Sequence, residues 1–512
     1  MDSGFVIRKN QYYDSVFLMG VNKRLSGFAG VRQTAVLMGS ERNKRLLHDI
    51  GVQDPQIETA QADDLIVAVV ADTPETVKMV LGQLEEALQA GESGAPASAL
   101  RTLEEGLAQK PNANLAVISI PGEYAAHETD KALVAGLNVF LFSGNVALEE
   151  ELRLKQRAHA SGLLVMGPDC GTSLIGGVGL GFANAVRRGP IGVVGAAGTG
   201  LQEFTSQVHN AGLGISHAIG TGSHDLSDSI GGLTTFQALE ALEADPQTKV
   251  IGLISKPPGP QTLRKLLDRL QRSPKPVVGC FLGTRLSPME AGHLHVARTI
   301  DDAVELAIRS TFEPLTGGAP VEPCDQERMA AERAGWSPAQ RYLRGIFAGG
   351  TFCYQAQQIL QAAGISLHSN VPLDPAARLP HPDQSIGHTL VDMGDDYYTL
   401  GKPHPMLDGT LRRQRILTES RDPAVAVLLL DFILGYNVSM DPVGELFDAI
   451  LEARLAAKQR GGALTVVASI CGTADDPQDL NLQTRLLHEA GIIVFGSSAR
   501  AARFACDLLQ LL

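Results

Sequence analysis

The sequence predicts an α/β protein built from parallel sheets. Short apolar runs rich in β-branched residues, such as residues 65–70, 115–120 and 250–254, alternate with amphipathic stretches of helical period. The chain contains 54 glycines but only 5% aromatic residues, a composition typical of folds in which many strands turn tightly into helices. We therefore expect buried parallel strands joined by crossover helices.

The apolar runs fall into three groups, and 512 residues are enough for several domains with separate cores. A basic Pro/Gly turn at residues 187–190 precedes a new strand, and a Pro- and Gly-rich stretch interrupts the strands after residue 313. We therefore place domains at residues 1–188, 189–313 and 341–512, with a linker at 314–340.

Charge and composition exclude several classes of protein. A formal net charge of −13 argues against binding to nucleic acid or to an anionic membrane, because either partner requires a basic face. Residues 1–8 lack the apolar core of a signal peptide, and no run approaches the roughly 18 apolar residues of a membrane span. Six cysteines lie far apart without a CxxC pair. We expect a cytoplasmic protein without disulfides or a bound metal.

A glycine-rich turn at residues 195–203 is the strongest candidate site. The pattern predicts a strand, a turn and a helix, so the backbone N–H groups of Gly198, Thr199 and Gly200 would face an anion at the helix N-terminus. The Thr199 hydroxyl could bind a phosphate oxygen, and Glu203, one turn later, could orient a base or cap the helix. Two alternatives stay open: a dinucleotide loop, although the spacing is not GxGxxG, and a tight turn without function.

Two motifs in this region resemble the succinyl-CoA synthetase α subunit. Residues 166–172 resemble its GPNCPG turn, with Asp169 in place of the asparagine. Residues 195–203 resemble its S-x-S-G-T-x-x-x-E turn, in which Gly198, Thr199 and Glu203 match. The resemblance implies that this helix start receives a phosphoryl group and that the glutamate lies beside a phosphorylated histidine.

The last domain resembles the carboxy-terminal domain of the β subunit of that enzyme, through residues 391–395, 430–437 and 471–474. The resemblance implies a second helix start that faces phosphate, which we place at Gly435, Tyr436 and Asn437. The fold it implies is a Rossmann-like CoA-binding-type domain followed by two flavodoxin-like domains of the succinyl-CoA synthetase type, α-like and then β-like.

This order of parts is similar to the FdrA family of acyl-CoA-synthetase-like proteins. That resemblance implies a subunit of an oxamate carbamoyltransferase, which converts oxalurate and phosphate into oxamate and carbamoyl phosphate in allantoin degradation. It implies companion subunits and a small anionic substrate, and it requires no cofactor; self-association stays open. The alternatives are a subunit of an NDP-forming acyl-CoA synthetase, which would use CoA and an ATP- or GDP-type nucleotide, and a non-catalytic scaffold.

The resemblance is incomplete at two points. Succinyl-CoA synthetase carries its phosphohistidine on a G-H-A-G-A loop, whereas here only Gly292 and His293 match in a shorter loop. His293 is therefore either a phosphoryl carrier or a solvated histidine. The chain also shows no ATP-grasp region, so a partner would have to supply the nucleotide site.

Two further places carry candidate side chains. The proline-stiffened loop at residues 401–409 presents Lys402, His404 and Asp408, a set suited to a dianionic substrate. His404 is expected to act as an acid/base group or a phosphate ligand, with a structural hydrogen bond as the alternative. Lys256 is expected at the carboxyl end of a strand, where ligands gather in open α/β sheets, although a solvated lysine would fit the same sequence.

Overall fold

A computed structural model describes residues 2–11, 13, 15–39, 43–44, 47–48, 51–61, 63–89, 100–284, 286–311, 326–400 and 402–510. The chain divides into two compact units. The first comprises Met1–Asn114 with Ser119–Ala125, and the second comprises Leu115–Ile118 with Ala126–Leu512.

The first unit contains an antiparallel sheet in the order β1-β3-β2. Its strands are β1 (Asp2–Arg8), β2 (Val31–Met38) and β3 (Leu65–Ala71), and its helices are α1 (Ser15–Ser26), α3 (Pro55–Glu58), α4 (Pro74–Gly82), α5 (Leu84–Gln89) and α6 (Leu103–Gln109). The expectation of a parallel strand at residues 65–70 is therefore wrong. A continuous apolar run indicates that a strand is buried, and β3 is buried as the central strand. Such a run does not indicate whether the strand pairs in a parallel or an antiparallel direction.

The second unit begins with a small parallel sheet in the order β4-β5-β6. It consists of β4 (Leu115–Ile118), β5 (Asn138–Leu141) and β6 (Val165–Met166), with α7 (Gly122–Val134) and α8 (Leu148–Ala160) between them. Parallel strands joined by helices are confirmed here.

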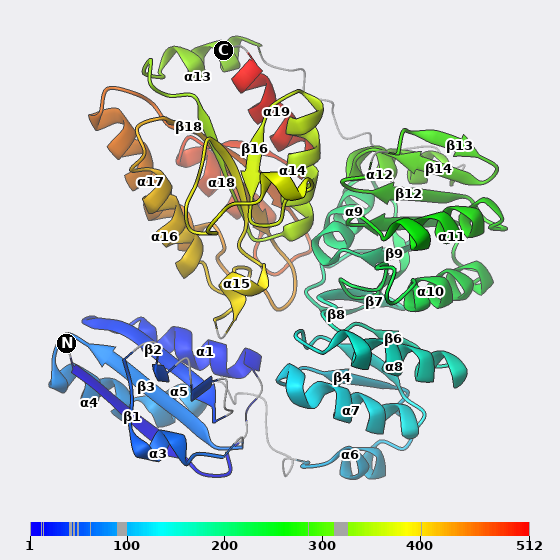
Figure 1. Ribbon diagram of the computed structural model, residues 1–512, viewed down its shortest axis with the longest axis horizontal. Helices are drawn as coiled ribbons and strands as arrows, with labels where there is room; N and C mark the ends of the chain where they lie inside the picture. The colour runs from blue at the N-terminus through cyan, green and yellow to red at the C-terminus, as the bar shows by residue number, and fades with distance from the viewer. Residues whose placement is uncertain are drawn as a thin grey trace. The chain divides into compact units, whose positions relative to one another are not determined.

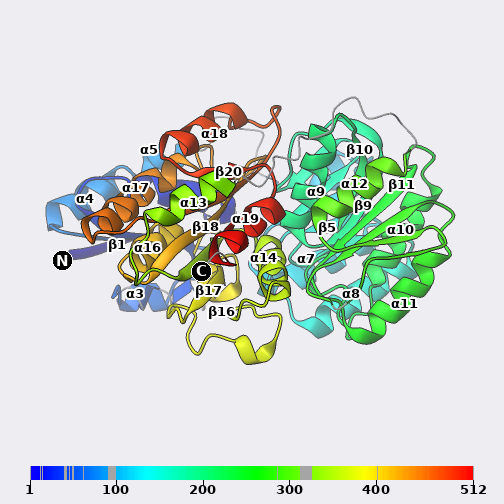
Figure 2. The same ribbon diagram turned by 90° about the horizontal axis from the view of Figure 1, so that it is seen from above.

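An eight-stranded sheet follows, in the order β13-β14-β12-β11-β9-β10-β7-β8. Figure 2 labels its strands β9, β10 and β11. Its strands are β7 (Thr172–Ile175), β8 (Val178–Gly181), β9 (Arg188–Ala196), β10 (Ile215–Gly220), β11 (Val250–Ser255), β12 (Val277–Phe281), β13 (Met289–Ala291) and β14 (Leu294–Ala297). Strands β9, β10, β11, β12 and β14 are parallel. Helices α9 (Gly198–Asn210) and α12 (Ile300–Arg309) cover one face, whereas α10 (Leu233–Ala244) and α11 (Pro260–Gln271) cover the other.

The last part is a six-stranded parallel sheet in the order β16-β17-β15-β18-β19-β20. Figure 1 labels its strands β16 and β18. Its strands are β15 (Tyr342–Phe347), β16 (Leu367–Ser369), β17 (His388–Asp392), β18 (Val425–Ile433), β19 (Thr465–Cys471) and β20 (Ile493–Phe495). Its helices are α13 (Gln326–Ala334), α14 (Gly350–Ala362), α15 (Asp396–Thr399), α16 (Thr410–Glu419), α17 (Gly444–Gln459), α18 (Leu480–Glu489) and α19 (Ser498–Gln510). The α/β class with parallel sheets is thus confirmed.

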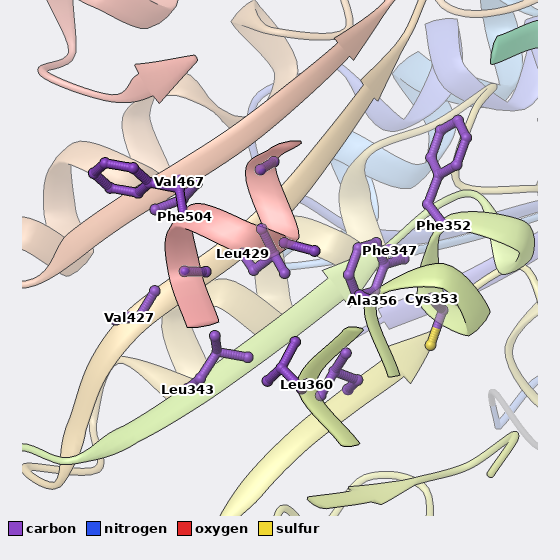
Figure 3. Packing of buried hydrophobic residues seen from close by; sticks show 14 of the residues in the cluster. Leu343, Phe347, Phe352, Cys353, Ala356, Leu360, Val427, Leu429, Val467 and Phe504 are labelled. Carbon is purple, nitrogen blue, oxygen red and sulfur yellow. The ribbon is translucent and has the colours of Figure 1, made fainter. Parts of the chain in front are cut away.

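The core of this last sheet fixes α14 and α19 on one of its faces. Figure 3 shows Leu343 of β15 near Leu360 of α14, and Phe504 of α19 near Val467 of β19. Helices α16 and α17 pack on the opposite face. Within the stretch proposed as a linker, residues 314–325 lie outside the described residues, whereas Met329 of α13 is buried in this core.

Candidate functional site

Helix α9 begins at the glycine-rich turn, as the sequence predicted. The first backbone N–H that bonds back along the helix belongs to Leu201, which donates to the Ala197 carbonyl at 2.9 Å. The N–H groups of Gly198, Thr199 and Gly200 therefore have no acceptor within the helix, and the helix dipole adds positive charge at the same point.

A second helix N-terminus, that of α14, faces α9. A Cβ atom added to Gly349 would lie 3.0 Å from Thr199 Oγ1, and one added to Gly200 would lie 2.9 Å from Thr351 Cγ2. Only glycine allows the two helix starts to approach this closely. The Gly349 N–H is used by Asp431, whereas Phe352 N is the first to bond back to the Gly349 carbonyl. The N–H groups of the two residues between them thus remain available.

The second helix start was predicted at residues 435–437, and that prediction is wrong. No helix begins between the end of β18 at Ile433 and the start of α17 at Gly444. Gly435 has a φ of 127° and Asn437 a φ of 60°, so neither residue has the backbone conformation of a right-handed helix. This turn instead packs on another segment of the unit: Tyr436 N donates to Ala183 O at 2.7 Å, and Asn437 Nδ2 donates to Gly181 O at 2.8 Å.

Lys256 lies at this double helix start, at the carboxyl end of β11. A Cβ atom added to Gly350 would lie 3.2 Å from Lys256 Nζ and 2.3 Å from Asp392 Oδ2, so the two side chains meet at the first residue of α14. The ammonium lies 5.5 Å from the Tyr354 ring centroid, and none of the hydrogen bonds or ion pairs found among the described residues involves it. Burial acts to lower the pKa of Lys256, yet nearby negative groups, Asp392 first, raise it above its usual value.

Two carboxyl groups, the buried Asp392 and the exposed Asp169, interact electrostatically with this lysine. Asp392, only 4% exposed, ends β17 and accepts a hydrogen bond from Gly394 N at 2.9 Å through Oδ1. Burial raises the pKa of Asp392 to about 6 although Lys256 attracts its charged form. Desolvation also acts to raise the pKa of Asp169, but this side chain is exposed to solvent, which limits that effect. Asp392 is therefore the acid that titrates closer to neutral pH, the range suited to proton transfer.

His404 joins the same cluster. Its Nδ1 accepts a hydrogen bond from Met406 N at 3.2 Å, and its ring centroid lies 5.8 Å from that of Phe182. A Cβ atom added to Gly394 would lie 2.8 Å from His404 Nε2 and 3.2 Å from Asp392 Oδ1, so the imidazole and the carboxyl border the same small space. Burial first, and then the positive charges of Arg412 and Lys256, lower the pKa of His404 to about 4.

Three other predicted residues make contacts elsewhere. Asp408 Oδ1 accepts from Thr410 N at 2.8 Å at the start of α16, and Lys402 is exposed. Glu203 points to α19, where its Oε1 accepts from Ser498 N at 2.5 Å and its Oε2 from Ser498 Oγ at 2.7 Å. Burial, followed by the charge of Asp301, raises the pKa of Glu203 to about 8. Glu203 therefore joins α9 to α19.

His293 lies at the opposite edge of the eight-stranded sheet. It occupies the turn between β13 and β14, and its carbonyl accepts from Val277 N, at the start of β12. The candidate site instead lies where β9 and β11 end, beyond Ala196 and Ser255, which pair with each other. Since β12 runs parallel to β11, a whole strand length separates His293 from that site.

The sequence identified Gly198, Thr199, Gly200, Lys256 and His404 as candidates, and the structure brings them to one cluster. It adds Asp392, Gly350 and Thr351, which the sequence interpretation missed. A signal was present, because Gly349-Gly350-Thr351 follows a buried strand just as Gly198-Thr199 does. Within the described residues, no group of three or more His, Cys, Asp or Glu side chains is arranged to hold a metal ion, and no helix is long and apolar enough to cross a membrane.

Three known domain families match the chain. A CoA-ligase domain matches residues 346–508, a CoA binding domain matches residues 186–276, and a domain described as "AllF, heavy metal-associated domain" matches residues 1–103. The first cysteine of the chain is Cys170, so the region matched by the third family contains no thiolate ligand.

Individual relatives agree with these domains. The α 1 subunit of an ADP-forming succinate–CoA ligase from Archaeoglobus fulgidus is 28% identical over 36% of this chain and 63% of that subunit. A dinucleotide-forming acetyl-coenzyme A synthetase from Ca. Korarchaeum cryptofilum covers 77% of this chain and 82% of its own at 18% identity, with a TM-score of 0.28 that is too low to support a comparison. The chain thus carries CoA-binding and CoA-ligase domains similar to those of succinyl-CoA synthetase.

The uncharacterized protein YahF of Escherichia coli K12 is 42% identical over 515 residues, which span 99% of both chains. This chain belongs to the same protein family as YahF.

Proposed function

We propose that this chain is a subunit of the NDP-forming acyl-CoA synthetase type that exchanges an acyl group between CoA and phosphate. The observation that carries the proposal is the pair of facing helix N-termini at Thr199 and Gly349, with the ammonium of Lys256 beside them. Backbone N–H groups, a hydroxyl and an ammonium converge there, and this is the donor set that binds phosphate.

The chemistry follows from that donor set. A phosphate held by both helix starts would attack the carbonyl of an acyl-CoA, and the same donors would stabilise the negative charge that develops on oxygen. Acyl phosphate and CoA would leave. CoA is a substrate in this proposal, and a nucleotide site would be contributed by a partner subunit.

The direct test is an exchange assay on the purified chain with a panel of acyl-CoA thioesters and phosphate. Phosphate-dependent release of free thiol, together with an acyl phosphate that hydroxylamine traps, is the expected result. Thiol release that does not depend on phosphate, or none from any thioester with partner subunits present, would contradict the proposal.

A second candidate is the FdrA-type carbamoyltransferase, in which phosphate attacks the carbamoyl carbonyl of oxalurate. The position of His293 favours it, because a reaction without nucleotide needs no phosphoryl carrier. Neither CoA nor a nucleotide would then be required. Incubation with oxalurate, phosphate and the companion subunits should yield carbamoyl phosphate and oxamate, whereas turnover of thioesters alone would exclude this candidate.

A further inference from the structure

His404 and Asp392 lie next to each other near the starts of α9 and α14. The two oxygens of Asp392 connect the parts of the cluster: Oδ2 lies on the side of Gly350 and Lys256, and Oδ1 on the side of His404. Phe182 lies beside the imidazole ring, and the hydrogen bond from Met406 N to Nδ1 fixes the opposite edge of the ring. The imidazole is thus fixed in orientation beside an anion site.

The hydrogen bond to Nδ1 determines which nitrogen of His404 carries the proton. A backbone N–H can only donate, so Nδ1, which receives it, must be the unprotonated acceptor. The neutral ring therefore carries its proton on Nε2. Within the described residues Nε2 has no hydrogen-bond partner, and it points to the space that it shares with Asp392 Oδ1.

We propose that His404 is a neutral hydrogen-bond donor that uses Nε2–H to bind the anion held between α9 and α14. Asp392 then accepts the proton that phosphate releases during acyl transfer. This inference rests on the proposed phosphate site. It excludes His404 as a phosphoryl carrier, because Nδ1 is occupied and Nε2 is protonated. A low pKa keeps the imidazole neutral at physiological pH, so it donates without exchanging its proton.

In the proposed step, phosphate displaces the leaving group from the acyl carbon. An oxygen of HPO4²⁻ attacks the acyl carbon, the C–O bond forms, and the carbonyl π pair moves to oxygen, where Nε2–H stabilises it. The phosphate proton passes to Asp392. When the adduct collapses, the bond to the leaving group breaks, and the leaving group takes the proton from Asp392. The products are an acyl phosphate and a protonated leaving group, and Asp392 returns to its carboxylate form.

Matched variants separate this role from the alternatives. His404→Gln places an amide N–H near the position of Nε2–H but can neither ionise nor carry a phosphoryl group, whereas His404→Ala removes the donor. By calorimetry with inorganic phosphate, we expect Gln to retain binding and Ala to weaken it by about ten- to a hundredfold, the usual effect of losing a hydrogen bond to a charged group. Asp392→Asn removes a negative charge and should bind phosphate at least as tightly as the wild type.

A measurement on the wild type covers the case in which a variant fails to fold. Nitrogen-15 NMR of histidine-labelled protein should show the Nε2–H tautomer of His404 from pH 5.5 to 8, as expected for a group with a pKa of about 4 that faces Arg412, Lys256 and Asp392. An Nδ1–H tautomer, protonation in that range, or equal loss of binding in the Gln and Ala variants would overturn the inference but leave the phosphate site standing. Failure of the wild type to bind phosphate would overturn both.

Discussion

Thr199, at the start of α9, and Gly349, directly before α14, lie in contact although the two helices pack on different sheets. The Thr199 hydroxyl occupies space that any side chain at position 349 would need, since an added Cβ atom would lie 3.0 Å from it. Two positive helix ends that face each other repel unless negative charge lies near them. Asp431 and Asp392 supply part of that charge at the start of α14, and a bound anion would add to it.

Gly350→Ala should abolish phosphate binding without unfolding the chain. The new methyl group would lie 2.3 Å from Asp392 Oδ2 and 3.2 Å from Lys256 Nζ, so both side chains would have to move. Calorimetry with phosphate measures the loss. Gly496→Ala is the matched control, because a Cβ atom there meets nothing within 4 Å. Equal binding by the two variants would show that phosphate does not contact the start of α14.

Lys256→Met should weaken phosphate binding by about ten- to a hundredfold, because the variant keeps the length of the side chain but loses its charge-assisted hydrogen bonds. The same titration with Lys265→Met provides the control, since Lys265 is exposed on α11. If both variants bind phosphate like the wild type, Lys256 is a solvated lysine.

Arg412→Met should destabilise the chain by about 3–5 kcal/mol, because it leaves the buried carboxylate of Asp431 without its cation. Arg412 Nη2 lies 2.8 Å from Asp431 Oδ1, and the same carboxylate accepts Ala348 N and Gly349 N, so this pair also positions the start of α14. Urea denaturation gives the free energy of unfolding. The exposed neighbour Arg413→Met should change it little, and similar losses from both arginines would argue against the buried pair.

Glu203 should make stability depend on pH. Its pKa is about 8 in the folded chain, whereas an unfolded glutamate titrates near about 4.3. The folded state therefore holds a proton that the unfolded state has lost. The contribution of Glu203 to the free energy of unfolding is complete below about pH 4 and is lost as the pH rises to about 8. The loss is at most about 1.4 kcal/mol per pH unit.

Unfolding curves between pH 5 and 8 test that prediction. Glu203→Gln, which keeps an acceptor for Ser498 N, should flatten the dependence, whereas the exposed Glu327→Gln should not. A wild-type slope that survives in Glu203→Gln would mean that another group causes it.

The sequence predicted the parts of the site that depend on local pattern. A strand followed by Gly198-Thr199 and an amphipathic stretch is typical of a helix start, and Lys256 is at the carboxyl end of a buried run. The proximity of Asp392 to Lys256 could not be predicted, because it depends on how two sheets meet. The turn at Gly435 was misassigned for a related reason: glycine permits both a helix start and a left-handed turn, and only the contact with Ala183 shows which one forms.

A crystal structure of the chain soaked with phosphate tests the central claim most directly. The predicted result is one phosphate between the starts of α9 and α14, within hydrogen-bonding distance of Thr199, Thr351 and Lys256. Phosphate bound elsewhere, with this space left to water, would contradict the account.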